Sequence, residues 1–180
     1  MNKRVLIAFS GGQPIDYLLK VLSVVAEREQ SAFGYYAPRP LSPSHCACTA
    51  FVKVGEQRAC KEFLPEEADV IMALEELEGR RVVRYLAKEG RMVLCYCHRL
   101  PMAVAVGTMG YPTDIQYRLG NEGRKVWLVK RVEMKPPFVA AMLLRAMGYA
   151  REETADILAA CDLVANEQDL QTVYEKEDIH

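Results

Sequence analysis

The 180-residue chain is long enough for one domain with a sizeable core, and 51% of its residues are hydrophobic. Its 23 Lys and Arg residues balance 24 Asp and Glu residues, and this net charge of −1 excludes the basic footprint of a nucleic-acid-binding protein. No run of about 18 apolar residues is available to span a membrane, and no signal-peptide pattern opens the sequence, so we expect a cytoplasmic protein. Its six cysteines are then expected as thiols, metal ligands or core residues rather than disulfides.

The first segment predicts a strand, a tight turn and a helix. Residues 5–9 are apolar, Pro14 suits the first position of a helix, and apolar residues at spacings of three and four continue to about residue 29. The turn consists of Ser10, Gly11, Gly12 and Gln13. A helix that starts after a glycine turn can hold a phosphate through free backbone N–H groups. A purely structural turn is the other interpretation, because Pro14 has no N–H to donate.

Two Cys-x-Cys pairs lie on predicted strands. Residues 32–36 form one expected strand, and residues 45–54 alternate cleanly enough to form the next. The pairs are His45-Cys46-Ala47-Cys48 and Cys95-Tyr96-Cys97-His98, each with two thiols on one face of its strand. A soft-metal site from these thiols and imidazoles would require the two strands to be neighbours that face the same way. Buried free cysteines are the alternative, because cysteine packs as a small apolar residue.

The middle of the chain predicts a βαβ unit. Residues 68–73 and 91–97 are apolar runs of strand type, and residues 75–87 between them have one apolar side at helical spacing. Gly90 is expected to end the helix in the left-handed conformation, so that the second strand returns parallel to the first. The acids Glu75, Glu76 and Glu78 are expected to form the solvated first turn of this helix.

The remaining elements complete a three-layer α/β/α fold. We expect a strand at 102–107, a short helix at 113–119, a strand at 125–129 and helices at 136–148 and 152–161. The prediction is one α/β domain over residues 1–165 with a mostly parallel central sheet of five to seven strands, followed by an acidic tail at 166–180. Ligands in open α/β sheets bind at the carboxyl ends of the strands, which makes Glu75 and His98 candidate site residues.

The stretch ADVIMALEELE at residues 68–78 resembles a known family. Together with Tyr85-Leu86, Gly90 and the following apolar strand, it is similar to the gamma domain of the 2-oxoacid:ferredoxin oxidoreductases, especially the small subunit of indolepyruvate oxidoreductase. Tyr111-Pro112 lies where this family places a Tyr-Pro. The family's Gly-x-Gly-Gly-Gln-Gly loop is matched at Gly11, Gly12 and Gln13, whereas Pro14 replaces its last glycine.

The resemblance implies an accessory subunit that acts with a large catalytic partner. In the family, thiamine diphosphate and the iron-sulfur clusters belong to other subunits, and this sequence lacks the Cys-x-x-Cys-x-x-Cys run of a ferredoxin cluster. We therefore expect no cofactor bound by this chain alone, no catalytic residue within it, and coenzyme A as a candidate ligand of the assembly. The predicted cofactor or interface residues are Ser10, Gly11, Gly12, Gln13, Glu75 and His98.

Two other functions stay open at this point. One is a stand-alone small-molecule-binding module of the same fold, consistent with the altered Gly-Gly-Gln-Pro loop, in which the chain is alone or a homodimer. The other is a metal- or redox-responsive protein that uses Cys46, Cys48, Cys95 and Cys97 as ligands. The sequence does not identify the 2-oxoacid.

Overall fold

The computed structural model describes residues 2–38, 46–55, 59–97, 100–115, 118–119, 125–130 and 135–175. The strands are β1 (Lys3–Ser10), β2 (Ala32–Tyr36), β3 (Ala47–Gly55), β4 (Ala68–Ala73), β5 (Leu86–Cys95) and β6 (Lys125–Val129). The helices are α1 (Asp16–Arg28), α2 (Glu76–Val82), α3 (Met102–Ala105), α5 (Pro136–Met147), α6 (Arg151–Ala160) and α7 (Glu167–Glu175), and a short 3₁₀ helix spans Val83–Tyr85. Within these ranges no helix is both long and apolar enough to cross a membrane.

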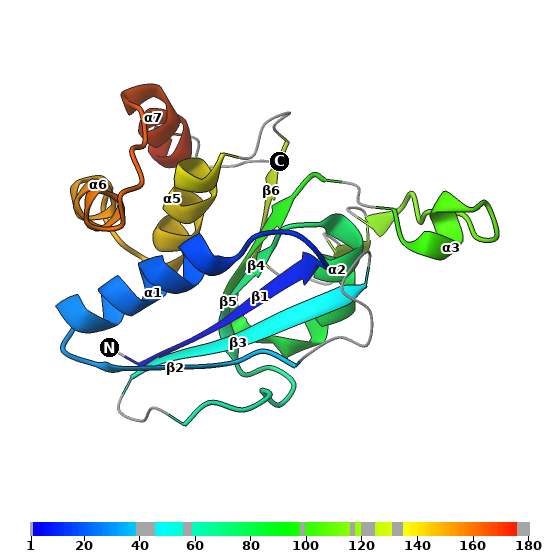
Figure 1. The fold of residues 1–180 in the computed structure, drawn as a ribbon, viewed down its shortest axis with the longest axis horizontal. Helices are drawn as coiled ribbons and strands as arrows, with labels where there is room; N and C mark the ends of the chain where they lie inside the picture. The colour runs from blue at the N-terminus through cyan, green and yellow to red at the C-terminus, as the bar shows by residue number, and fades with distance from the viewer. Residues whose placement is uncertain are drawn as a thin grey trace.

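All six strands belong to one sheet, in the order β2-β3-β1-β4-β5-β6 (Figure 1). The pairs β1·β4, β4·β5 and β5·β6 are parallel, whereas β1·β3 and β2·β3 are antiparallel. The predicted mostly parallel sheet in a single α/β domain is therefore confirmed, as is the parallel βαβ unit of β4, α2 and β5. The strands expected at 32–36, 68–73 and 125–129 are also present.

The core lies in two layers because successive residues of each strand face opposite sides of the sheet. On one side, which we name the first layer, Val5 and Ile7 of β1 pack with α1, α5, α6 and α7. On the other side, which we name the second layer, Leu6 and Ala8 pack with Phe51, Phe63, Tyr85 and the residues that follow α2. Both faces are covered, which explains why the central strands are apolar almost throughout.

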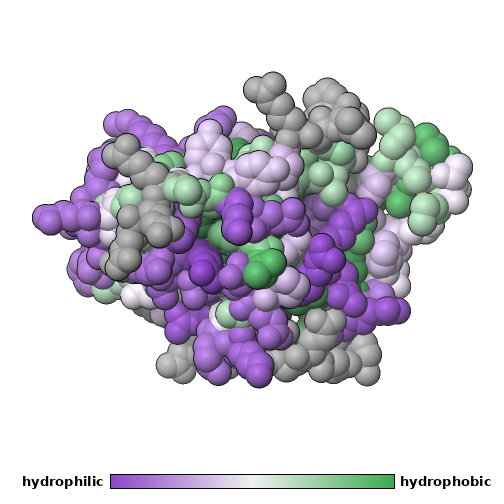
Figure 2. Space-filling model, turned by 90° about the horizontal axis from the view of Figure 1, so that it is seen from below, coloured by the Kyte–Doolittle hydropathy of each residue, from purple (hydrophilic) through white to green (hydrophobic). Residues whose placement is uncertain are grey.

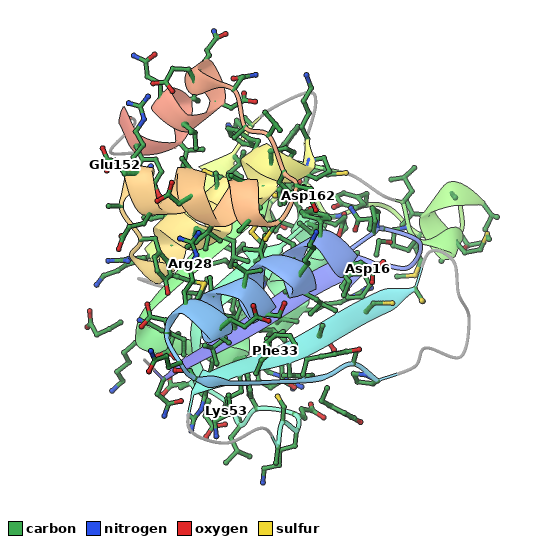
Figure 3. All side chains as sticks on the ribbon, turned by 60° about the vertical axis from the view of Figure 1, so that its left-hand side comes forward. Asp16, Arg28, Phe33, Lys53, Glu152 and Asp162 are labelled. Carbon is green, nitrogen blue, oxygen red and sulfur yellow. The ribbon has the colours of Figure 1, made fainter. Side chains whose placement is uncertain are left out.

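Helix α6 lies along α1 in the first layer, as Figure 3 shows. The ammonium of Lys20 donates to the Cys161 carbonyl at 3.0 Å and to the Asp162 carboxylate at 2.8 Å. The guanidinium of Arg28 donates to the Asp156 carbonyl at 2.8 Å. These polar contacts fix the two helices side by side at the rim of the apolar core.

The predicted helix at 75–87 is wrong in its second half. Helix α2 ends at Val82, and the chain enters β5 at Leu86, which is fully buried and pairs with Ala68 of β4. Gly90 is inside β5 rather than at a helix end, and it has no positive φ. A Cβ at Gly90 would lie 2.8 Å from the Ala68 carbonyl oxygen, so this glycine permits the close approach of two strands.

Three further expectations differ from the structure or fall partly outside the described residues. The strand expected at 102–107 is instead α3 (Met102–Ala105), which has no buried residue. Residues 167–175 of the expected acidic tail form α7, whose Leu170 and Val173 are buried against the first layer. The helix expected at 113–119 lies partly outside the described residues, although Ile115 and Leu119 are buried in the second layer.

Candidate functional site

The candidate site lies at the edge of the sheet where β1, β4 and β5 end. These three strands are parallel, so the residues that follow them meet at one edge. The strands end at Ser10, Ala73 and Cys95, and α1 and α2 follow β1 and β4 in the chain. Open α/β sheets bind ligands at this edge because helix starts and strand ends converge there.

The β1–α1 turn is held by its own hydrogen bonds. The Gly11 N–H donates to the Cys46 carbonyl at 2.8 Å, and the Gln13 N–H donates to the Ser10 carbonyl at 3.0 Å. The side-chain oxygen of Gln13 accepts from the Ser10 N–H at 2.7 Å, while its amide nitrogen donates to the Leu74 carbonyl at 3.2 Å. Gly12 has a φ of 86°, which favours glycine. Gln13 therefore joins the ends of β1 and β4, and three backbone donors of the turn already have partners within the chain.

Glu75 joins the start of α2 to the chain at Tyr111. Its backbone is extended, and one carboxylate oxygen accepts from the Glu78 N–H at 2.9 Å as a helix N-cap. The other oxygen accepts from the Tyr111 hydroxyl at 2.5 Å. Glu75 is only 1% exposed. Burial and the bond to the Glu75 carboxylate raise the pKa of Tyr111, so this hydroxyl stays protonated as a donor.

The other two acids of α2 are also buried, which corrects the prediction of a solvated first turn. Glu76 is 3% exposed and Glu78 is 5% exposed. The Glu78 carboxylate accepts from Arg81 at 2.5 Å. Burial nevertheless raises the pKa of Glu78 above its usual value, because this effect exceeds the lowering effect of Arg81. The carboxyl groups of Glu75, Glu76 and Glu78 thus lie within one helical turn at the beginning of α2.

A cavity of about 110 Å³ opens between the beginnings of α1 and α5. It is lined by Gln13, Pro14, Tyr17, Leu74, Cys95, Cys97, Pro136 and Val139. Burial raises the pKa of both Tyr17 and Cys95, so these groups are neutral near pH 7. None of the described residues in this lining has a cationic side chain, and the volume is well below the roughly 300 Å³ at which ligand pockets begin.

The four strand cysteines do not form one site. Strands β1 and β4 separate β3 from β5, so the two Cys-x-Cys pairs are about 14 Å apart across three strand spacings. The Cys46 and Cys48 sulfurs lie 3.5 Å from each other, and burial raises the pKa of Cys48 to about 12. Among the residues that the structure describes, no three His, Cys, Asp or Glu side chains are grouped to hold a metal ion. The four-cysteine metal site is therefore wrong.

Some predicted site residues come together, and others lie outside the described part. Ser10, Gly11, Gly12, Gln13 and Glu75 all lie at the same edge, which follows from β1 and β4 being parallel neighbours. His98 and His45 lie outside the described residues. Tyr111 was not predicted as a site residue, although the Tyr111-Pro112 pair was visible in the sequence and its hydroxyl reaches Glu75.

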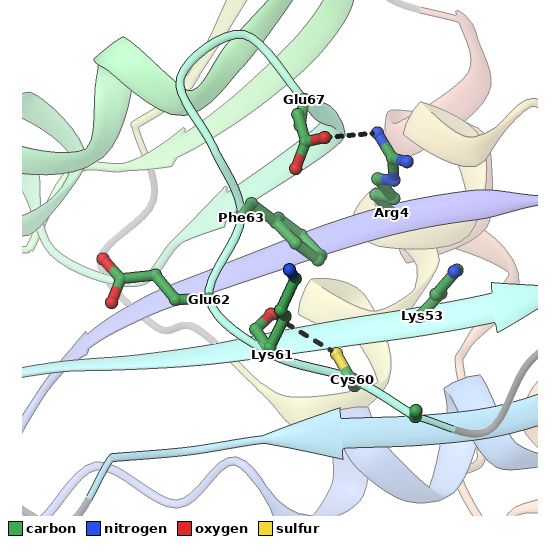
Figure 4. A pocket seen from close by; sticks show the side chains of 8 residues that line it. Arg4, Lys53, Cys60, Lys61, Glu62, Phe63 and Glu67 are labelled. Carbon is green, nitrogen blue, oxygen red and sulfur yellow. Dashed lines mark hydrogen bonds and ion pairs between the residues drawn. The ribbon is translucent and has the colours of Figure 1, made fainter.

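A larger cavity, of about 260 Å³, lies at the opposite end of the sheet (Figure 4). Arg4 of β1 and Lys53 of β3 are register partners on the same face, and with Lys61 they surround Phe63. Arg4 forms an ion pair with Glu67 at 3.2 Å. No sequence pattern indicated this cavity, because Arg4 and Lys53 meet only through the pairing of β1 with β3.

Neither cavity fits the cofactors that the resemblance implies. Coenzyme A and thiamine diphosphate carry phosphates, and the 110 Å³ cavity has no cation among its lining residues. The 260 Å³ cavity has cations but is smaller than a pocket for a molecule of that size. The residues described in this chain therefore do not form a complete site for either cofactor.

Comparison with known proteins gives matches in structure only. No protein-family model matches the sequence, and no curated protein matches it significantly. The pyruvate oxidoreductase subunit PORC of Thermotoga maritima superposes with a TM-score of 0.64 at 13% identity, covering 97% of this chain and 96% of that chain. The gamma subunit of a keto/oxoacid ferredoxin oxidoreductase from Geobacter sulfurreducens PCA superposes with a TM-score of 0.58 at 11% identity, covering 96% of both chains.

A third structure contains the same fold as part of a longer chain. It is the 2-oxoglutarate:ferredoxin oxidoreductase of Magnetococcus marinus, determined with 2-oxoglutarate, coenzyme A and succinyl-CoA bound. Its TM-score is 0.54 at 13% identity, and the match covers 97% of this chain but 29% of that chain. The chain described here therefore has the fold of the gamma subunits of 2-oxoacid:ferredoxin oxidoreductases.

Proposed function

We propose that this chain is an accessory, gamma-type subunit of a thiamine-diphosphate-dependent 2-oxoacid:ferredoxin oxidoreductase that assembles with a large catalytic subunit. The observation that carries the proposal is the fold match over 96% or more of this chain and of two separate gamma subunits. The large partner subunit holds thiamine diphosphate and the iron-sulfur clusters.

The substrate in this proposal is an aryl or branched 2-oxoacid, as in the indolepyruvate enzymes. Its support is the sequence ADVIMALEELE followed by Tyr85-Leu86 and Gly90, which resembles the small subunit of those enzymes. In the structure, this stretch forms β4, α2 and the beginning of β5, and it carries Glu75 at the edge of the sheet. Coenzyme A, where the assembly uses it, is held mainly by the partner.

The test is purification of the tagged chain from native, anaerobic extract, followed by mass spectrometry. We expect a large subunit that carries thiamine diphosphate and iron-sulfur clusters, in a fixed ratio to this chain. The purified complex should then reduce ferredoxin faster with indolepyruvate than with pyruvate. Purification of the chain alone would contradict the subunit assignment, and a preference for pyruvate would contradict the indolepyruvate assignment only.

A stand-alone small-molecule-binding module is the second candidate function, and the 260 Å³ cavity favours it. Arg4 in this cavity is paired with Glu67, which leaves the ammonium groups of Lys53 and Lys61 with one further carboxylate, that of Glu62, and this excess of one positive charge suits a small organic anion. Calorimetric titration of the isolated chain with citrate tests this candidate. Binding that is lost in Lys53→Ala and kept in the exposed control Lys88→Ala would support it, and no heat of binding would dismiss it.

A further inference from the structure

Residues 100–113, which we name the arm, form an uncharged apolar projection. They lie between Arg99 and Asp114 and include no Asp, Glu, Lys, Arg or His. Helix α3 of the arm stands away from the rest of the described structure in Figures 1 and 3, and apolar side chains gather at this end in Figure 2. Leu100, Met102, Val106 and Met109 are between 42% and 66% exposed. Such a group of exposed large apolar side chains is typical of an interaction surface.

The backbone of the arm already has many of its hydrogen bonds. The Pro101 carbonyl accepts from the N–H groups of Val104 and Ala105 at 2.9 Å. The Ala103 carbonyl accepts from the Thr108 N–H at 2.9 Å, and also from the Thr108 hydroxyl at 2.8 Å. A segment with paired backbone groups and no charges can enter an apolar environment without the large cost of burying unpaired polar groups.

The base of the arm is anchored to the candidate site. The Tyr111 hydroxyl donates to the buried Glu75 carboxylate at 2.5 Å, which ties the arm to the beginning of α2. The direction of the arm is therefore set by the folded chain before any partner binds. Preorganisation of this kind lowers the entropy cost of association.

We propose that the arm inserts into an uncharged, apolar groove on the large catalytic subunit, an inference that rests on the function proposed above. The arm presents apolar side chains and no charge, so the groove that receives it must be apolar and free of unpaired charge. Neither of the two cavities that the described residues line is such a groove. Arg4, Lys53, Lys61, Glu62 and Glu67 line the larger cavity, and the smaller one measures only about 110 Å³.

A second copy of this chain is a poorer partner for the arm. Two arms in contact would bury a surface of a few hundred Å² at most, on the order of a single apolar patch. A stable interface buries about 800 Å² on each partner. The arm therefore needs a partner that surrounds it, and a groove on a larger subunit meets this condition.

The experiment compares two double variants in the complete complex. Met102→Glu with Met109→Glu places two charges on the arm, while Leu64→Glu with Val164→Glu places two charges on exposed apolar residues elsewhere. Each tagged protein is co-expressed with the catalytic subunit, and the affinity of the purified subunits is measured by biolayer interferometry. We expect at least a tenfold loss of affinity for the arm variant and less than a twofold change for the control. Circular dichroism and thermal melting check the fold, and the milder Met102→Ser with Met109→Ser serves if the charged variant does not fold.

The outcomes separate this inference from the proposed function. If the wild-type chain binds no catalytic subunit, both are overturned. If the wild type binds and the arm variants bind equally well, the inference is wrong and the proposed function stands. Analytical ultracentrifugation of the chain alone tests the other partner, a second copy of this chain. If the wild type is a dimer and the arm variant is a monomer, a second copy binds the arm and the proposal is wrong.

Discussion

Tyr111 and Glu75 connect two parts of the chain that lie 36 residues apart. Glu75 caps α2 with one carboxylate oxygen and holds the Tyr111 hydroxyl with the other. The sequence indicated an acid at the end of β4, but it did not indicate that both oxygens are used within the chain. Glu75 therefore has a structural role at the edge of the sheet, in addition to its predicted place at an interface.

Removal of the Tyr111 hydroxyl should weaken the fold. We expect Tyr111→Phe to lower the free energy of unfolding by about 1.5–3 kcal/mol, because a hydrogen bond to a buried charged group is lost. Urea unfolding measures this change. The matched control is Tyr149→Phe, whose hydroxyl donates to the exposed Glu29 at 3.0 Å and should matter by less than about 0.5 kcal/mol. Equal effects of the two substitutions would contradict the special role of Tyr111.

Glu78 should make stability fall as pH rises. Its folded-state pKa is raised above the ordinary value of 4.5, so the folded chain holds the proton more tightly than the unfolded chain. The wild type therefore becomes less stable, relative to a variant with an uncharged side chain at position 78, as pH rises from about 4.5 through the raised pKa of Glu78. We expect the unfolding free energy of Glu78→Gln, minus that of the wild type, to increase over this range in urea titrations.

Glu89→Gln supplies the control of opposite sign for this experiment. A hydrogen bond from Lys125 lowers the pKa of Glu89, so its contribution is present above the unfolded pKa and is lost as pH falls. The unfolding free energy of Glu89→Gln, minus that of the wild type, should therefore decrease as pH rises. A flat difference for Glu78→Gln would show that Arg81 fully compensates its burial.

Among the elements, the connection from α2 to β5 differs most from the sequence prediction. The apolar residues Val82, Tyr85 and Leu86 fit a helical period, but only Val82 is in α2. Leu86 instead pairs with Ala68 at the beginning of β4, and the register of the two strands then shifts before Val70. Periodicity does not distinguish a buried helix end from a short buried strand, since both are apolar.

Gly90→Ala tests the close approach of β4 and β5. The new Cβ would lie 2.8 Å from the Ala68 carbonyl oxygen and 3.1 Å from the Ala87 carbonyl oxygen, so the backbone must move. We expect a loss of about 1–3 kcal/mol in the free energy of unfolding, as for other overpacked sites. Gly110→Ala is the control, because no atom lies within 4 Å of its added Cβ. Comparable stability of the two variants would contradict the tight packing at Gly90.

The molecule as a whole is held together by contacts that include its C-terminal segment. Leu170 and Val173 of α7 are buried against α5, and an arginine of α5, Arg145, donates to the Val173 carbonyl. Tyr174 donates to the Tyr149 carbonyl at 2.9 Å. Helix α7 is therefore part of the first layer, whereas composition alone indicated an acidic tail.

A chain that ends at residue 165 should be less stable than the full chain. Burial of Leu170 and Val173 contributes about 1.5–3 kcal/mol for each side chain, so we expect a loss of about 3–6 kcal/mol on truncation. Thermal and urea unfolding of the two proteins measure it. Equal stability of the 165-residue and full chains would support a dispensable tail.

The sequence by itself predicted the α/β class and the parallel unit of β4 and β5, and it named Gln13 and Glu75 separately as candidate site residues. These features follow from apolar runs and helical spacing, both of which are local. It did not predict the short α2, the helical arm or the burial of Glu76 and Glu78, because each depends on which surfaces the rest of the chain covers.

The tertiary structure alone decided how distant residues combine. It separated the two Cys-x-Cys pairs by placing β1 and β4 between their strands, and it brought Arg4 beside Lys53 through antiparallel pairing. It also made an apolar stretch, Met102–Ala105, a helix with no buried residue. Strand order and register are set by packing over the whole chain, so local patterns specify the elements but not their neighbours.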